Sequence, residues 1–281
     1  MVVCTGRHPR GWATVRGMDV RPLPALQPGQ AAPAALWLLR HGNSEGNAAD
    51  AAAHRDGLAR LEVEARDADV PLTDLGHRQA AAVGRWLADQ PEDRRPTAVL
   101  VSPYRRAVQT AQGVLEGAGL DLPLASDERL RERDLGAFDG LTSRGIREEL
   151  PGEFERRRRV GKMWYRPPGG ESWADVLLRV RSMLATELPR YAGERLLVVS
   201  HQAVVMAFRM VLEGLDEARA LAIDDDEPQA NGALTRYRAA DGGGLELEAY
   251  ADTAPVETRG APATEQPDAE EEATGADSAR A

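Results

Sequence analysis

Cysteine and lysine are almost absent from this chain of 281 residues, which contains one of each, Cys4 and Lys162. A single cysteine cannot form an internal disulfide bond or a cysteine-based zinc site. Such scarcity is typical of proteins in a reducing compartment. We therefore expect a cytoplasmic protein whose basic chemistry depends on arginine and histidine.

Long apolar runs and an excess of positive charge are also missing. No stretch approaches the roughly 18 apolar residues of a membrane span, and residues 1–33 lack the apolar centre of a secretory signal. The formal net charge is −10, which disfavours binding to the nucleic-acid backbone. We expect no membrane and no nucleic acid among the partners. Nothing in the sequence indicates the oligomeric state.

The two ends of the chain differ in composition from its middle. Residues 1–33 carry proline, alanine and glycine without periodicity, which predicts a flexible N-terminal lead-in. Residues 252–281 contain eight acidic and two basic residues and no aromatic residue. Such a segment buries too little apolar area to offset its ordering entropy, so we expect a disordered acidic tail. One domain then covers residues 34–251.

Strand and helix patterns alternate within this domain. Apolar runs of strand type end before polar turns, and helical periodicity follows them. This order predicts an α/β fold, a three-layer sandwich in which helices flank a mostly parallel central sheet. The expected strands are 35–39, 98–101, 122–124, 195–199, 233–237 and 245–250. Helices are expected after the cap Thr73, from Pro103 to about Leu115, within 142–164, after the capping pair Ser172 and Asp175, and over 202–212.

Four short blocks contain residue types that suit a phosphate site. Arg40-His41, residues 102–107 and residues 199–202 each directly follow an expected strand, and the fourth block is residues 130–136. Because the carboxyl ends of parallel strands meet at one edge of a sheet, we expect the first three blocks to converge there.

In order, these blocks resemble four motifs of the histidine phosphatase superfamily, which includes the phosphoglycerate mutases. The resemblance runs from about Trp37 to Leu212 and begins with Arg-His-Gly at 40–42. It implies a phosphoglycerate mutase-like fold and a phosphohistidine intermediate. Two positions depart from the pattern: Asn43 stands where members often have Glu or Gln, and Gln202 where they often have Gly.

The resemblance implies five catalytic residues. Arg40 and Arg106 match the pair that binds the phosphate, as suits a guanidinium that donates to two oxygens and stays charged. His41 matches the nucleophile, which attacks phosphorus with one ring nitrogen while the other donates to a backbone carbonyl. Glu132 matches the proton donor, and His201, protonated beside the phosphate dianion, stabilises the equatorial oxygens. We expect no metal and no cofactor.

Ser44, Asn47 and Arg133 match positions that bind substrate in the family, and alternatives stay open for each. Ser44 and Asn47 are also common turn residues. For Glu132 the alternative is a surface carboxylate that pairs with Arg131 or Arg133. The run of arginines at 156–159 likewise has two interpretations, a solvated helix face paired with nearby glutamates or a contact to a second anionic group of the substrate.

The expected function is hydrolysis of a small phosphorylated metabolite by a metal-independent phosphatase of the histidine acid phosphatase type. A mutase would use the same residues but must exclude water. Family mutases tend to have a longer insertion between the acid and the second histidine than the 69 positions from Glu132 to His201 here. A non-catalytic module that binds a phosphorylated ligand is the third alternative.

Overall fold

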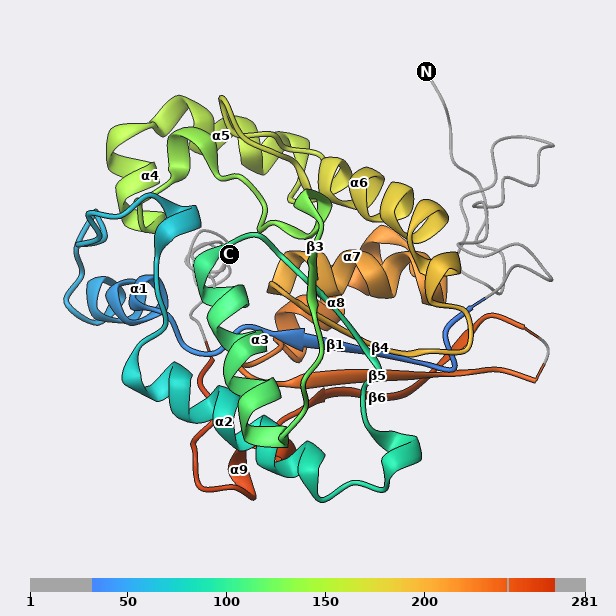
Figure 1. Cartoon of the computed structure of the whole chain (residues 1–281). Coiled ribbons are helices and arrows are strands. Elements are labelled where there is room, and N and C mark those ends of the chain that lie inside the picture. Colours follow the sequence, from blue (N-terminus) through green and yellow to red (C-terminus); the bar gives the residue numbers. More distant parts are fainter. Residues whose placement is uncertain (1–31, 242, 266–281) are drawn as a thin grey trace, which may run out of the picture.

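The computed structural model describes residues 32–241 and 243–265, in which a central sheet has six strands in the order β3-β2-β4-β1-β5-β6 (Figure 1). The first four strands in this order are parallel to one another, whereas β5 pairs antiparallel with β1 and β6 antiparallel with β5. The mixed but mostly parallel sheet confirms the expected fold class. The strands are β1 Ala35–Arg40, β2 Ala98–Val101, β3 Leu124–Ser126, β4 Arg195–Ser200, β5 Leu234–Ala239 and β6 Leu245–Asp252.

Helices cover both faces of the sheet, because the central strands are apolar at successive positions and bury both sides. Trp37, Leu39 and Val199 pack on one face against α2 Asp74–Ala88, α3 Arg105–Ala118 and α9 Ala254–Glu257. Leu38 and Val198 pack on the other face against α6 Trp173–Thr186 and α7 Gln202–Glu213 (Figure 1). The result is the predicted three-layer sandwich.

Local capping fixes where several helices begin. Thr73 accepts from the backbone of Gly76 at the start of α2, and Ser172 forms the expected capping box with Asp175 at the start of α6. The helix α3 begins two residues later than predicted from Pro103, because Tyr104 is its N-cap. The remaining α-helices are α1 Glu45–Arg55, α4 Ser143–Glu149, α5 Pro151–Val160 and α8 Glu217–Asp226. Short 3₁₀ helices are η1 Asp67–Asp69, η2 Glu92–Arg94, η3 Glu128–Leu130, η4 Gly136–Phe138 and η5 Leu188–Tyr191.

The polar helical region expected within 142–164 contains two helices, α4 and α5, and α5 begins at Pro151 (Figure 1). They share a small apolar cluster of their own that includes Ile146, Phe154 and Tyr165. In the arginine run, Arg156 and Arg158 are exposed and lie within ion-pair distance of Glu153 and Glu155. These contacts favour the interpretation as a solvated helix face.

Residues 252–265 are folded, which corrects the expectation that disorder begins at residue 252. Val256 and Ala261 are buried in the core cluster of α2 and α3. The backbone of Asn231 donates to the carbonyl of Thr264 at 2.8 Å. The composition of this segment is polar on average, but its apolar side chains Val256 and Ala261 pack against α2 and α3 and hold it on the domain. Residues 266–281 and 1–31 lie outside the described residues, as does most of the expected lead-in.

Candidate functional site

Three of the four sequence blocks meet at the carboxyl edge of the sheet. His41, Ser102 and His201 follow β1, β2 and β4, and these strands are neighbours in the order β2-β4-β1. The ring centroids of His41 and His201 are 5.1 Å apart, and the rings meet edge to face at 62°. Glu132, from the remaining block, reaches the same place: its Oε2 is 3.8 Å from Nδ1 of His201.

The imidazole of His41 is held in one orientation. Its Nδ1 lies 2.7 Å from the carbonyl oxygen of Gly42, a contact that requires Nδ1 to carry the proton and to donate. Burial, with the positive charges of Arg106 and Arg40, lowers the pKa of His41 well below 6.5. His41 is therefore neutral, and Nε2 presents a lone pair suited to nucleophilic attack.

The loop that carries His41 is fixed by close packing against the start of α2. A Cβ atom at Gly42 would lie 2.6 Å from the carbonyl oxygen of Gly76, so only glycine fits without movement. The backbone N–H of Gly42 donates to Thr110 at 3.0 Å, and the side-chain amide of Asn231 donates to the carbonyl oxygen of His41 at 3.1 Å. These contacts set the position of the ring.

Two buried guanidinium groups flank the histidines. Arg40 is 2% exposed and donates to the carbonyl oxygen of Gln229 at 2.5 Å. Burial lowers the pKa of Arg40 to about 10, and Glu132 and Asp224 oppose this shift. Arg106, at the start of α3, is 5% exposed and lies in an ion pair with Asp67. Because its pKa is about 10, Arg40 remains cationic near neutral pH, as binding an anion requires.

His201 is fully buried, and its Nε2 lies 2.8 Å from the hydroxyl oxygen of Ser102. Burial lowers the pKa of His201 well below 6.5, and Arg106 and His41 act in the same direction. Burial is the largest cause, because it disfavours the charged ring, and the charges of Arg106, Arg179 and Arg40 add to it. In the ligand-free protein His201 is therefore neutral. The expectation of a protonated ring concerns the protein with a bound dianion and stays a prediction.

The environment of Glu132 suits a proton donor. Burial raises its pKa, while the hydrogen bond from the backbone N–H of Arg133, at 2.8 Å, and the charge of Arg106 oppose the rise. A raised pKa was expected from a nearby phosphate, but burial and the charge of Asp67 already raise the pKa of Glu132 in the ligand-free protein. The side chain stays 23% exposed, so its proton can reach a ligand.

The three residues expected to bind substrate lie near the two histidines, and each makes contacts that stabilise the local structure. Ser44 and Asn47 form the capping box of α1, and the side-chain oxygen of Asn47 also accepts from Asn231 at 3.2 Å. The guanidinium of Arg133 lies 5.7 Å from the ring centroid of Trp173. Substrate contact by these three residues stays a prediction.

Several residues of the site escaped the sequence analysis. Ser102 follows a strand inside a recognised block, so the rule that located His41 could have assigned it a role. Asp67, Thr110, Gln229 and Asn231 carry no comparable signal. They contact Arg106, Gly42, Arg40 and His41 through turns and helix faces that only the tertiary structure brings near.

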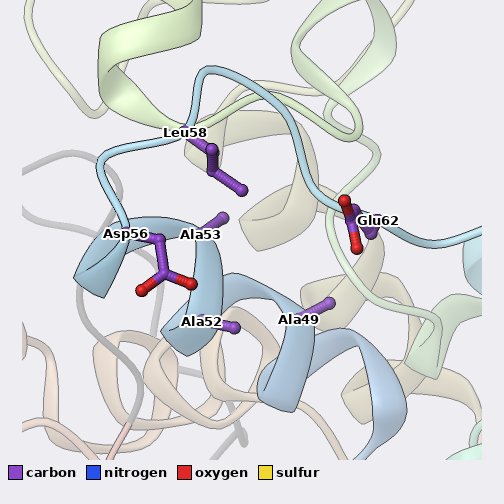
Figure 2. Close-up of a pocket in the computed structure, with 6 residues that line it drawn as sticks. All are labelled: Ala49, Ala52, Ala53, Asp56, Leu58 and Glu62. Atoms are coloured by element: carbon purple, nitrogen blue, oxygen red, sulfur yellow. The ribbon is translucent and has the colours of Figure 1, made fainter.

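Two pockets lie beside α1 rather than over the histidines. Figure 2 shows the first, of about 240 Å³, between α1 and the segment that follows it; its lining residues are Ala49, Ala52, Ala53, Asp56, Leu58 and Glu62. The second, of about 350 Å³, is lined by Glu45, Glu62, Val63, Glu64 and Ala65. Neither includes a predicted catalytic residue.

The part of the chain that the structure describes contains neither a cluster of potential metal ligands nor a membrane-spanning helix. No group of three or more His, Cys, Asp or Glu side chains within 32–241 and 243–265 is arranged to hold a metal ion. None of the helices in this part of the chain combines the length and the apolar character needed to cross a bilayer.

Comparison with known proteins agrees with this geometry. A 2,3-bisphosphoglycerate-dependent phosphoglycerate mutase of Methylobacterium sp. (strain 4-46) is 38% identical over 192 residues, which are 64% of this chain and 81% of the relative. The structure of Bacillus stearothermophilus YhfR has a TM-score of 0.63 at 26% identity and covers 80% of this chain and 100% of its own. A mycobacterial glucosyl-3-phosphoglycerate phosphatase, Rv2419c, has a TM-score of 0.57 at 27% identity and covers 78% and 98%.

A sequence model of the histidine phosphatase superfamily (branch 1) matches residues 36–253, which include all four blocks. The chain belongs to the histidine phosphatase superfamily.

Proposed function

We propose that the protein is a phosphomonoesterase that hydrolyses a small phosphorylated metabolite through a phosphohistidine on His41. The observation that carries this proposal is the fixed imidazole of His41, whose Nδ1 donates to Gly42 and whose Nε2 is left as the nucleophile. Arg40, Arg106 and His201 surround it with groups suited to a dianion.

In the proposed reaction, Nε2 of His41 attacks phosphorus and the bond from phosphorus to the ester oxygen breaks. Glu132 transfers its proton to the leaving oxygen, which departs as an alcohol. Water then attacks the phosphohistidine, Glu132 takes a proton from it, and inorganic phosphate leaves with His41 restored. Arg40 and Arg106 offset the charge of the phosphoryl group throughout, a contribution of about 10²–10³ in rate per donor.

Two observations favour hydrolysis. The segment between Glu132 and His201 contains two short helices, α4 and α5, and their apolar cluster is small. A segment of this size supports hydrolysis, because a mutase must exclude water from the intermediate. A structural relative, at 27% identity, is a glucosyl-3-phosphoglycerate phosphatase, which also supports a phosphatase.

The second candidate is mutase-type phosphoryl transfer. It is favoured by the name of the relative from Methylobacterium, a 2,3-bisphosphoglycerate-dependent phosphoglycerate mutase at 38% identity. The intermediate on His41 would be the same, and the fate of the phosphoryl group separates the two activities. A non-catalytic module would bind phosphate and do neither.

The test uses a chromogenic phosphate ester and a panel of metabolite phosphates, each in the presence of a chelator. We expect metal-independent release of phosphate that falls at least about 10³-fold in His41→Ala. His77→Ala is the matched control, because His77 is exposed on α2 and should retain full activity. Transfer between positions of phosphoglycerate with little net release would instead establish a mutase, and binding without turnover a module.

A further inference from the structure

The carboxylate of Asp67 forms an ion pair with Arg106, the proposed phosphate-binding residue, although Asp67 belongs to none of the four sequence blocks. Asp67 begins the short helix η1, in the segment that connects α1 to α2. Its Oδ1 is 2.8 Å from Nη1 of Arg106 and its Oδ2 is 3.3 Å from Nη2. Its backbone carbonyl also accepts from Nη1 at 2.5 Å. One residue thus accepts three contacts from a single guanidinium group.

These contacts occupy one edge of the guanidinium group and leave a second edge available to a ligand. A guanidinium has five N–H donors. Asp67 accepts one hydrogen bond from Nη1, through its carbonyl oxygen, and one from Nη2, and its Oδ1 forms an ion pair with Nη1. The Nε–H and the second N–H of Nη2 form the side edge, and no hydrogen bond among the described residues uses Nε of Arg106. Such a pair of parallel donors matches two oxygens of a phosphate.

The face of the same guanidinium is also held. The ring of Tyr104 lies 5.0 Å from Cζ of Arg106, in a cation–π arrangement. The Arg106 side chain is only 6% exposed. Held at one edge by Asp67 and at one face by Tyr104, the guanidinium has little freedom to rotate, so its remaining edge is preorganised for an anion.

We propose that Asp67 is a positioning residue that orients Arg106 to bind the phosphate group of the substrate. The inference rests on the phosphate-binding role of Arg106 in the proposed function. The negative charge of Asp67 also repels a phosphate, but its side chain is 41% exposed and is screened by solvent. Orientation of the buried guanidinium outweighs that repulsion.

The experiment measures binding of inorganic phosphate by titration calorimetry, which needs no turnover. Asp67→Asn should weaken phosphate binding about tenfold, the size of one charge-assisted hydrogen bond. Asp67→Glu should recover part of the loss. Asp69→Asn is the matched control: it makes the same chemical change two residues away, where the carboxylate pairs with the exposed Arg66, and should leave binding unchanged.

A double-mutant cycle separates orientation of Arg106 from a general effect on the loop. In an Arg106→Ala background, Asp67→Asn should no longer change phosphate affinity. An equal loss of phosphate affinity in both backgrounds would overturn the proposal. Unchanged or tighter phosphate binding in Asp67→Asn alone would also overturn it, and tighter binding would mean that Asp67 competes with phosphate. If the wild-type protein binds phosphate without hydrolysing esters, the proposed function fails while this inference stands. If it does not bind phosphate, both fail.

Discussion

His41 and His201 share one buried cluster, yet their ring contacts suit different tasks. The Nδ1–H of His41 donates to a carbonyl, which fixes the tautomer of a nucleophile. Nε2 of His201 contacts a hydroxyl group, which both donates and accepts, so this ring can take up a proton without losing its partner. His201 is therefore the histidine expected to change protonation when an anion binds.

Anion binding should consequently depend on pH. Because the pKa of His201 lies well below 6.5 in the free protein, the ring is neutral there, and a bound dianion favours its protonated form. Each anion then binds with uptake of a proton, so affinity falls as pH rises. Sulfate, which stays doubly charged from pH 6 to 8, should bind more weakly toward pH 8, approaching tenfold per pH unit.

Two variants identify the group that takes up this proton. The pH dependence of sulfate binding should flatten in His201→Asn and persist in Glu132→Gln. If it flattens in the glutamine variant instead, the carboxyl group of Glu132 takes up the proton and the assignment to His201 is wrong.

Glu132 can be tested through the leaving group. Its raised pKa keeps it protonated to higher pH than an ordinary glutamate, and ester hydrolysis should fall as pH rises through that pKa. Glu132→Gln should slow hydrolysis of an alkyl phosphate by about 10²–10⁴ and remove this decline at high pH. A nitrophenyl phosphate, whose leaving group needs no proton, should lose much less. Equal losses for both esters would argue against proton donation.

At the scale of elements, a strand or helix start can be predicted from sequence where one short segment determines it. The strand β2 was predicted at its observed bounds, because a parallel strand buried on both faces is a continuous apolar run. The capping box at Ser172 and Asp175 was likewise predicted, since both partners lie within four residues. The same local patterns located His41 and His201 at strand ends.

Prediction failed where distant segments decide the structure. The helix α8 contains three successive aspartates, a poor local signal for a helix. Gln229 and Asn231 reach the site from a turn after it, and Asp67 reaches Arg106 from a different loop. Each contact is set by packing between elements, which residue spacing does not encode.

The packing of the His41 loop on α2 depends on Gly42. In Gly42→Ala the new Cβ would lie 2.6 Å from the backbone oxygen of Gly76, so one of the two segments must move. We expect a loss of about 1–3 kcal/mol in the free energy of unfolding, measured by urea denaturation. Gly152→Ala is the control, because open space surrounds that position in α5 and alanine should stabilise the helix by about 0.4–1 kcal/mol. Similar effects at both sites would contradict this view of the loop.

At the scale of the whole molecule, the closing segment, residues 252–265, runs from the end of β6 to α2, which also contacts the loop that carries His41. After β6, α9 buries Val256 against α2 and α3. The side-chain amide of Gln79, on α2, donates to the carbonyl of Pro262 at 2.8 Å, and its oxygen accepts from the backbone N–H of Asn43 at 2.7 Å. The segment thus supports the backbone one residue beyond Gly42.

A chain that ends at Ala251 tests this connection. It loses the fully buried Val256 and the two hydrogen bonds that Gln79 donates to Pro262 and Thr264, so its free energy of unfolding should fall by about 2–4 kcal/mol. Phosphate affinity should also fall at a temperature where the shortened protein is still folded, because Gln79 no longer holds Asn43 in place. A chain that ends at Glu265 keeps every one of these contacts and should match the full-length protein in both measurements. Equal stability of the two shortened chains would mean that the apolar contacts of Val256 and Ala261 contribute little. A loss of stability without a loss of phosphate affinity would mean that the segment stabilises the core but does not support the site.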